Sequence, residues 1–179
     1  RMVLGVTDFR LHRSLRKTLT HFVRNPACEI RFDTAFVHVI SHCADMSRRG
    51  QPGTWILPAM VDAYSRLHGA GLAHSVETWV DGHLVGGLYC VALGQAVFGE
   101  SMFALVPDAS KIALAALVGF CRNEGAELID CQQNTQHLAS LGAAEIPRAR
   151  FLSHIRQAQL APAPQWQFSP LYWNHILSA

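Results

Sequence analysis

Two alternating segments joined by Asp81-Gly82 constrain the fold of this chain more than any other feature. Residues 74–80 alternate in side-chain character as a strand does, and residues 84–90 return with a similar pattern. Asp-Gly between two such runs is typical of a two-residue β-hairpin turn. A break at Gly94 then leads into a third segment, residues 97–103. The sequence therefore predicts an antiparallel meander.

Helices and further strands surround this meander. Alternation predicts strands at 28–32 and 127–132. Apolar residues recur at helical spacing over 14–25, 34–46, 58–69, 110–123 and 148–160. Asp33 or Thr34 is expected to cap the second of these helices, and Asp108 or Ser110 the fourth, which is apolar nearly all round and should be buried. The pattern predicts an α/β protein of the α+β type, with one mixed, mostly antiparallel sheet flanked by helices.

Composition narrows the class of protein. Half of the 179 residues are hydrophobic and 16% are charged, as in a folded globular protein. A net charge of +2 is too small to indicate nucleic-acid binding by itself. Five cysteines without a C-x-x-C pair favour reduced, buried thiols. No signal peptide is visible, and no apolar run approaches the roughly 20 residues of a membrane span, so we expect a cytoplasmic protein without membrane contact.

Several catalytic and binding classes are disfavoured by missing motifs. His38 and His42 lie one helical turn apart beside Cys43, but no matching pair of ligands and no H-E-x-x-H is present, so we expect no metal. The sequence has no G-x-x-x-x-G-K-[ST] loop and no G-x-G-x-x-G turn for nucleotide phosphates. Ser101 lacks the G-x-S-x-G setting of a nucleophile elbow.

The helix expected at 14–25 has a basic face made by Arg13, Arg16, Lys17 and Arg24. A solvated face on an amphipathic helix is the interpretation we favour, and contact with phosphates is the alternative.

One apolar strand ends in a carboxylate and an amide, and a second carries a glutamate, so the two could form a site. Alternation predicts that Glu100 and Met102 share one face of their strand, and that Asp130 and Gln132 share one face of theirs. If the strands are neighbours, two carboxylates and an amide meet beside Phe98. Asp130 could instead cap the next turn, and Glu100 could form a salt bridge. Buried acids are costly, and glycine at 99 permits close approach of a ligand, so we favour a functional site.

These segments resemble a known family. The motifs Gly-Glu-Ser-Met-Phe at 99–103, Asp-Cys-Gln at 130–132, His-Leu-Ala-Ser-Leu-Gly-Ala at 137–143 and Glu-Ile-Pro-Arg at 145–148 closely resemble those of bacterial leucyl/phenylalanyl-tRNA–protein transferases. Further segments upstream resemble motifs of the same family in the same order: residues 53–56, 63–64, 67–68, 73–77 and 85–87. The resemblance is dense over about residues 50–160, which is too long for chance.

The resemblance implies a fold related to the GCN5-type acetyltransferases, without coenzyme A or another cofactor. The chain lacks the Q/R-x-x-G-x-G/A loop that holds pyrophosphate in those enzymes, so a coenzyme A-dependent acyltransferase has only fold analogy behind it. The family resemblance implies a reaction in which Leu, Phe or, less well, Met moves from the 3′ end of an aminoacyl-tRNA to the N-terminal Arg or Lys of a protein. This is the tagging step of the bacterial N-degron pathway. The alternative is a non-catalytic module that binds aminoacyl-tRNA or basic N-termini.

The resemblance also assigns roles to residues. Asp130 would orient or deprotonate the incoming amine, Gln132 would place the amine or the ester, and Glu100 would support Asp130 and attract the acceptor's basic side chain. The substrate-binding residues would be Phe98, Gly99, Ser101 and Met102, which line an apolar pocket, and Trp55, which stacks on the terminal adenine of the tRNA. Trp55 could instead be a core aromatic.

The chain departs from the family at two places. The family has an N-terminal domain that precedes the start of this sequence, and Thr135 stands where the family has Asn. We therefore expect residues 1–30, an extended segment and basic helix, to be a remnant of that N-terminal portion. Residues 31–162 would form the catalytic domain. Residues 163–179 would form a tail with aromatic residues and Pro that packs back on the body in irregular form.

Overall fold

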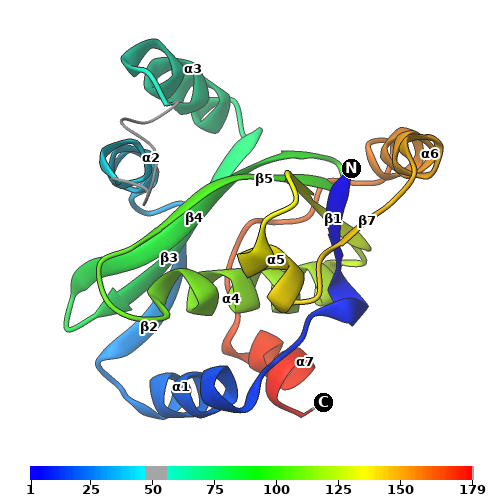
Figure 1. The fold of residues 1–179 in the computed structure, drawn as a ribbon. Coiled ribbons are helices and arrows are strands. Elements are labelled where there is room, and N and C mark those ends of the chain that lie inside the picture. The colour runs from blue at the N-terminus through cyan, green and yellow to red at the C-terminus, as the bar shows by residue number, and fades with distance from the viewer. Residues whose placement is uncertain (47–55, 179) are drawn as a thin grey trace.

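A mixed sheet forms the centre of the computed structural model, which describes residues 1–46 and 56–178 (Figure 1). Within these residues the strand order is β2-β3-β4-β5-β6-β1-β7. The strands are β1 (Met2–Gly5), β2 (Cys28–Phe32), β3 (Ala73–Val80), β4 (His83–Leu93), β5 (Ala96–Ala104), β6 (Leu128–Gln132) and β7 (Ala144–Glu145). Neighbouring strands are antiparallel except β5 and β6, which are parallel. The predicted meander and the mixed, mostly antiparallel sheet are confirmed.

Helices cover both faces of this sheet. They are α1 (Arg13–Arg24), α2 (Phe36–Asp45), α3 (Pro58–Gly69), α4 (Ala109–Glu124), α5 (Gln136–Ser140), α6 (Arg148–Ala158) and α7 (Asn174–Leu177). Short 3-10 turns, η1 (Val6–Asp8) and η2 (Pro170–Trp173), complete the described elements. The predicted helices at 14–25, 34–46, 58–69, 110–123 and 148–160 correspond to α1, α2, α3, α4 and α6.

The two faces of the sheet belong to two apolar cores, as alternate residues of β4 show. Leu88 and Cys90 lie in the larger core, which α4 fills, whereas Tyr89 lies in a smaller core with Phe36 of α2. Val91 packs against that smaller core together with side chains of α3. We call the first face the α4 face and the second the α3 face. The prediction that the helix at 110–123 is buried is confirmed, since side chains on all sides of α4 are buried.

The start of α2 differs from the sequence-based expectation. Neither Asp33 nor Thr34 caps the helix, and Ala35 occupies the cap position without a side-chain cap. The cap comes from β3, because the Ala35 N–H donates to Glu77 Oε1 at 2.7 Å. Asp33 instead accepts the Ser75 N–H at 2.7 Å, and Thr34 donates its hydroxyl to Glu77. A carboxylate on a neighbouring strand thus replaces the local capping side chain.

The C-terminal tail packs back on the body, as predicted. Trp166 lies 4.7 Å from Phe120 of α4 between ring centroids and stacks on His74 of β3 at 4.0 Å. Phe168, Tyr172 and Trp173 extend this aromatic packing. The prediction of an irregular tail is wrong for residues 170–177, which form η2 and α7.

In the described residues, no helix combines the length and apolar character that a membrane span requires.

Candidate active site

A β-bulge in β5 sets the direction of Glu100. In the β4–β5 register Tyr89 pairs with Ser101 and Cys90 pairs with Gly99, so Glu100 is the extra residue of the bulge. A bulge interrupts the alternation of a strand and re-aims a side chain. Ser101 shares the face of its partner Tyr89, and Glu100 contacts Tyr64 of α3. Glu100 therefore points to the α3 face.

The same bulge separates Met102 from Glu100, which corrects the sequence-based expectation. Met102 pairs with Leu88 and packs against the larger core on the α4 face. Phe98 pairs with Val91, whose side chain packs on the α3 face. The prediction that Glu100 and Met102 share a face is wrong, because simple alternation does not continue through a bulge. For the same reason Phe98 and Met102 lie on opposite faces of β5.

Asp130 lies where three strands meet. It pairs with Phe98 of β5 in the parallel ladder and with Val3 of β1 in the antiparallel one. Its side chain is almost fully buried, with 2% of the residue exposed. Asp130 Oδ1 accepts the backbone N–H of Gln132 at 2.8 Å. Gln132 has a left-handed backbone with φ of 63°, which is unusual for a residue other than Gly, Asn or Asp. The capping of the next turn by Asp130, one of the two alternatives, is therefore present.

Arg1 is the main partner of Asp130. The Arg1 Nε donates to Asp130 Oδ1 at 2.9 Å, and Nη2 donates to Oδ2 at 2.8 Å, in a two-pronged contact. This hydrogen bond is the largest cause of the raised pKa of Arg1. The Arg1 backbone is held in turn by Ile146, and its guanidinium lies 5.8 Å above the ring centroid of Phe151.

Sequence reasoning missed Arg1. The signal was its position at the start of an apolar segment, Met2–Leu4, that could pair with the strand that carries Asp130. Only the insertion of β1 between β6 and β7 brings the two residues together.

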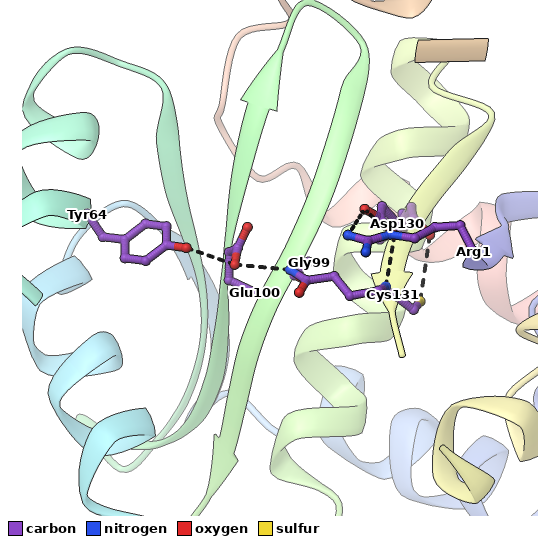
Figure 2. A network of polar contacts seen from close by, with 8 residues as sticks. Arg1, Tyr64, Gly99, Glu100, Asp130 and Cys131 are labelled. Carbon is purple, nitrogen blue, oxygen red and sulfur yellow. Dashed lines mark hydrogen bonds and ion pairs between the residues drawn. The ribbon is translucent and has the colours of Figure 1, made fainter. Parts of the chain in front are cut away.

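Glu100 and Gln132 form a second group beside Asp130. Figure 2 shows Tyr64 on the side of Glu100 that lies away from Asp130. The Tyr64 hydroxyl donates to Glu100 Oε2 at 2.9 Å, and Gln132 Nε2 donates to the same oxygen at 3.0 Å. Gln132 Nε2 also donates to the Gly99 carbonyl at 3.1 Å. The two predicted carboxylates therefore do not meet directly: Glu100 contacts Gln132, and Asp130 contacts Arg1 and the backbone of Gln132.

The remaining predicted site residues have different surroundings. Ser101 is buried on the α3 face. Gly99 lies so close to β6 that a Cβ there would be 3.3 Å from the Asp130 carbonyl oxygen, so its lack of a side chain serves strand packing. Cys131 packs against the larger core, and burial followed by the charge of Asp130 raises the pKa of its thiol to about 12. Trp55 lies outside the described residues.

The part of the chain that the structure describes contains no candidate metal site. Residues 1–46 and 56–178 contain no group of three or more His, Cys, Asp or Glu side chains that could hold an ion. A hollow of about 580 Å³ beside the C-terminal turns and another of about 400 Å³ along α1 do not include Glu100, Asp130 or Gln132 among their lining residues. Glu100, Asp130 and Gln132 together offer hydrogen-bond donors, acceptors and charges where β5 and β6 lie next to each other.

Known proteins match this chain over most of its length. The family model described as leucyl/phenylalanyl-tRNA protein transferase matches residues 3–156. A leucyl/phenylalanyl-tRNA–protein transferase of Polaromonas sp. is 67% identical over all of this chain and 70% of its own length. One from Albidiferax ferrireducens is 59% identical over 99% of this chain and 70% of its own length.

A solved structure provides a comparison at the level of the fold. The structure of L-PGS from Bacillus licheniformis covers 97% of this chain and 58% of that chain, with a TM-score of 0.51 and 11% identity. An aminoglycoside N-acetyltransferase in complex with CoA covers 70% of this chain and 93% of that chain, with a TM-score of 0.49 and 18% identity. The first likeness is one of fold alone, and the family is shown by the sequence matches. The chain belongs to the leucyl/phenylalanyl-tRNA–protein transferase family.

Proposed function

We propose that this chain transfers Leu, Phe or, less well, Met from an aminoacyl-tRNA to the N-terminal Arg or Lys of an acceptor protein. Membership of the family supports the transfer of an amino acid from tRNA to protein. The observation that carries the proposal for this site is the convergence of Glu100, Gln132 and Asp130 where β5 and the end of β6 lie side by side.

The chemistry asks for positioning more than for covalent catalysis. An aminoacyl ester is already activated, so holding the amine against the ester and stabilising the developing oxyanion supply most of the acceleration. The incoming α-amine has a pKa near 8, so part of the amine population must lose a proton before attack. We propose that Asp130 orients the amine, since its charge lies beside Gln132, and that the Gln132 side chain contacts the amine or the ester.

The two faces of β5 suggest separate places for the two substrates. The α3 face carries Tyr64 and Glu100, whose polar groups suit a basic acceptor side chain. The α4 face at Met102 is apolar, with Leu88 and other core side chains around it. An apolar aminoacyl side chain gains most from an apolar environment, and the flexible thioether of Met adapts to Leu or Phe. We therefore place the aminoacyl side chain against Met102, with Phe98 beside the acceptor.

Replacing Met102 with Ala should lower kcat/KM for Leu-tRNA about 10-fold and leave the KM of the acceptor peptide unchanged, because truncating one apolar wall of a pocket removes roughly 1–3 kcal/mol. Steady-state kinetics with one substrate varied at a time measure both effects. Phe98→Ala is the matched variant on the opposite face and should raise the acceptor KM instead. If Phe98→Ala weakens Leu-tRNA and Met102→Ala does not, the two faces have been assigned the wrong way round.

The basic face of α1 supports tRNA as the partner. Side chains of this one helix line the hollow of about 400 Å³: Arg13, Arg16, Lys17, Thr20, His21 and Arg24. The helix carries no acidic residue. Arg16 is also held by the Leu177 carbonyl at 2.8 Å, so its guanidinium is positioned rather than free. With tRNA as substrate, phosphate contact becomes the preferred interpretation of this helix. A tRNA substrate also fits the predicted cytoplasmic location.

Incubating the full-length protein with Leu-tRNA and a peptide that begins with Arg tests the proposed function. We expect a product that begins Leu-Arg, detected by mass spectrometry. The same peptide with an acetylated N-terminus should give none, since the nucleophile is blocked, and a peptide that begins with Glu should react far less. Binding of Leu-tRNA or peptide without product would instead support the alternative of a non-catalytic binding module.

A further inference from the structure

Glu100 receives two fixed hydrogen bonds at a single oxygen. Its Oε2 accepts from the Tyr64 hydroxyl at 2.9 Å and from Gln132 Nε2 at 3.0 Å. Among the described residues no hydrogen bond or ion pair involves its other oxygen, Oε1. Asp130 differs, since both of its oxygens contact the guanidinium of Arg1. Of the two acids, Glu100 is the one that keeps a carboxylate oxygen without a hydrogen bond or ion pair among the described residues, so this oxygen can accept from a basic ligand.

The same contacts determine which way the Gln132 amide points. The two groups within reach of its Nε2 are the Gly99 carbonyl and the Glu100 carboxylate, and each accepts a hydrogen bond from it. The amide must therefore present its nitrogen to them and its oxygen to the opposite side. A carbonyl oxygen turned away from Gly99 and Glu100 is a suitable acceptor for the N–H of an attacking amine. If Glu100 were not held in place, it would no longer determine which way the Gln132 amide points.

Tyr64 differs from Glu100 and Gln132 in that it comes from a helix, α3, and not from β5 or β6. It lies in the middle of α3, and its ring packs edge-on against Tyr89 of β4, with 5.1 Å between the centroids. This packing fixes the ring, so the hydroxyl reaches Glu100 without a large loss of side-chain entropy on binding. Figure 2 shows Tyr64 extending from α3 toward Glu100, on the side opposite Arg1 and Asp130. Burial and the charge of Glu100 raise the pKa of Tyr64 above its usual value, which keeps the hydroxyl protonated.

We propose that Tyr64 is a positioning residue for the acceptor: it holds Glu100 by one oxygen so that the other meets the acceptor's basic side chain, and through Glu100 it orients the Gln132 amide. This inference rests on the proposed function, because it names the element that prepares the same site for its acceptor. Tyr64 itself touches neither reacting atom. Its removal therefore acts mainly on the binding of the acceptor and leaves the binding of aminoacyl-tRNA as it was.

The test is Tyr64→Phe in the full-length protein, which deletes one hydroxyl and keeps the ring. We expect the KM of the Arg-initiated peptide to rise about 10-fold, in line with the loss of one hydrogen bond to a charged group, while the KM of Leu-tRNA changes less than about 2-fold. Tyr172→Phe is the matched control, because Tyr172 contacts Glu124 near the C-terminus and lies away from Glu100. It should change neither constant.

A second variant separates positioning from general stability. In a Glu100→Gln background, Tyr64→Phe should add less than about 2-fold to the acceptor KM, since the charge through which Tyr64 acts is gone. Equal losses in both backgrounds would overturn the inference, as would an unchanged acceptor KM in Tyr64→Phe. A protein that forms no Leu-Arg product in any form would instead refute the proposed function, so the two failures are distinguishable.

Discussion

Asp130→Asn should lower kcat/KM for transfer of Leu to an Arg-initiated peptide by about 100-fold, a loss in the range for removing one group that acts on the transition state. Asn keeps an oxygen for the Gln132 N–H, whose contact with Asp130 is 2.8 Å long. It removes the negative charge and turns an amide N–H toward the donors of Arg1. The turn at Gln132 can thus survive while the electrostatics of the site change. Single-turnover rates with saturating Leu-tRNA measure the effect on the transfer step.

Two further variants show how Asp130 acts. Asp108→Asn is the matched control, because Asp108 also contacts a cation, Lys111 Nζ at 2.7 Å, but lies at the start of α4. It should leave transfer within about 2-fold. Arg1→Gln breaks the same ion pair from the other side. If it costs as much as Asp130→Asn, and the double variant costs no more, Asp130 serves only to hold Arg1. A transfer rate of Asp130→Asn equal to that of the unchanged protein contradicts any role in the reaction.

Features encoded by neighbouring residues could be predicted from the sequence. The hairpin at Asp81-Gly82 is one, since both residues have positive φ, 51° and 73°, which this residue pair accepts readily. The start of α3 at Pro58 and the end of α4 before Gly125 are others. In each case the local sequence alone favours one conformation, so the feature can be predicted without knowledge of tertiary contacts.

Features that depend on pairing between distant segments could not be predicted. The direction of Met102 required the β4–β5 register, because a bulge at Glu100 changes which residues share a face. The contact between Arg1 and Asp130 spans 129 positions and exists only because β1 lies between β6 and β7. The sequence motif identified Glu100, Asp130 and Gln132, but the hydrogen bonds among them came from the fold. Tyr64 was part of the family resemblance, and its role appeared only when α3 was placed beside β5.

Glu77→Ala should have the largest effect on stability. Glu77 is fully buried in the middle of β3, and its carboxylate connects β3 to the start of α2. It accepts hydrogen bonds from the Ala35 N–H at 2.7 Å, the Ser75 hydroxyl at 2.8 Å, Trp79 Nε1 at 3.0 Å and the Thr34 hydroxyl. Alanine would leave a cavity, and these donors would be buried away from water without an acceptor. Because a buried donor without a partner costs about 1–3 kcal/mol, we expect a loss of about 3–5 kcal/mol in the free energy of unfolding.

Chemical denaturation of the full-length protein measures this loss, and a thermal melt should show a Tm lower by about 10 °C for a chain of this size. Glu77→Gln separates the two contributions, because it restores the volume but places an amide N–H among donors; we expect it to fall between Glu77→Ala and the unchanged protein. Glu29→Gln is the control. Glu29 faces solvent on the adjacent strand, opposite Trp79, and contacts Arg31, so its loss should stay within about 0.5 kcal/mol. A Glu77→Ala protein as stable as Glu29→Gln would mean that the carboxylate does not anchor α2 to β3, and that the helix relies on apolar packing alone.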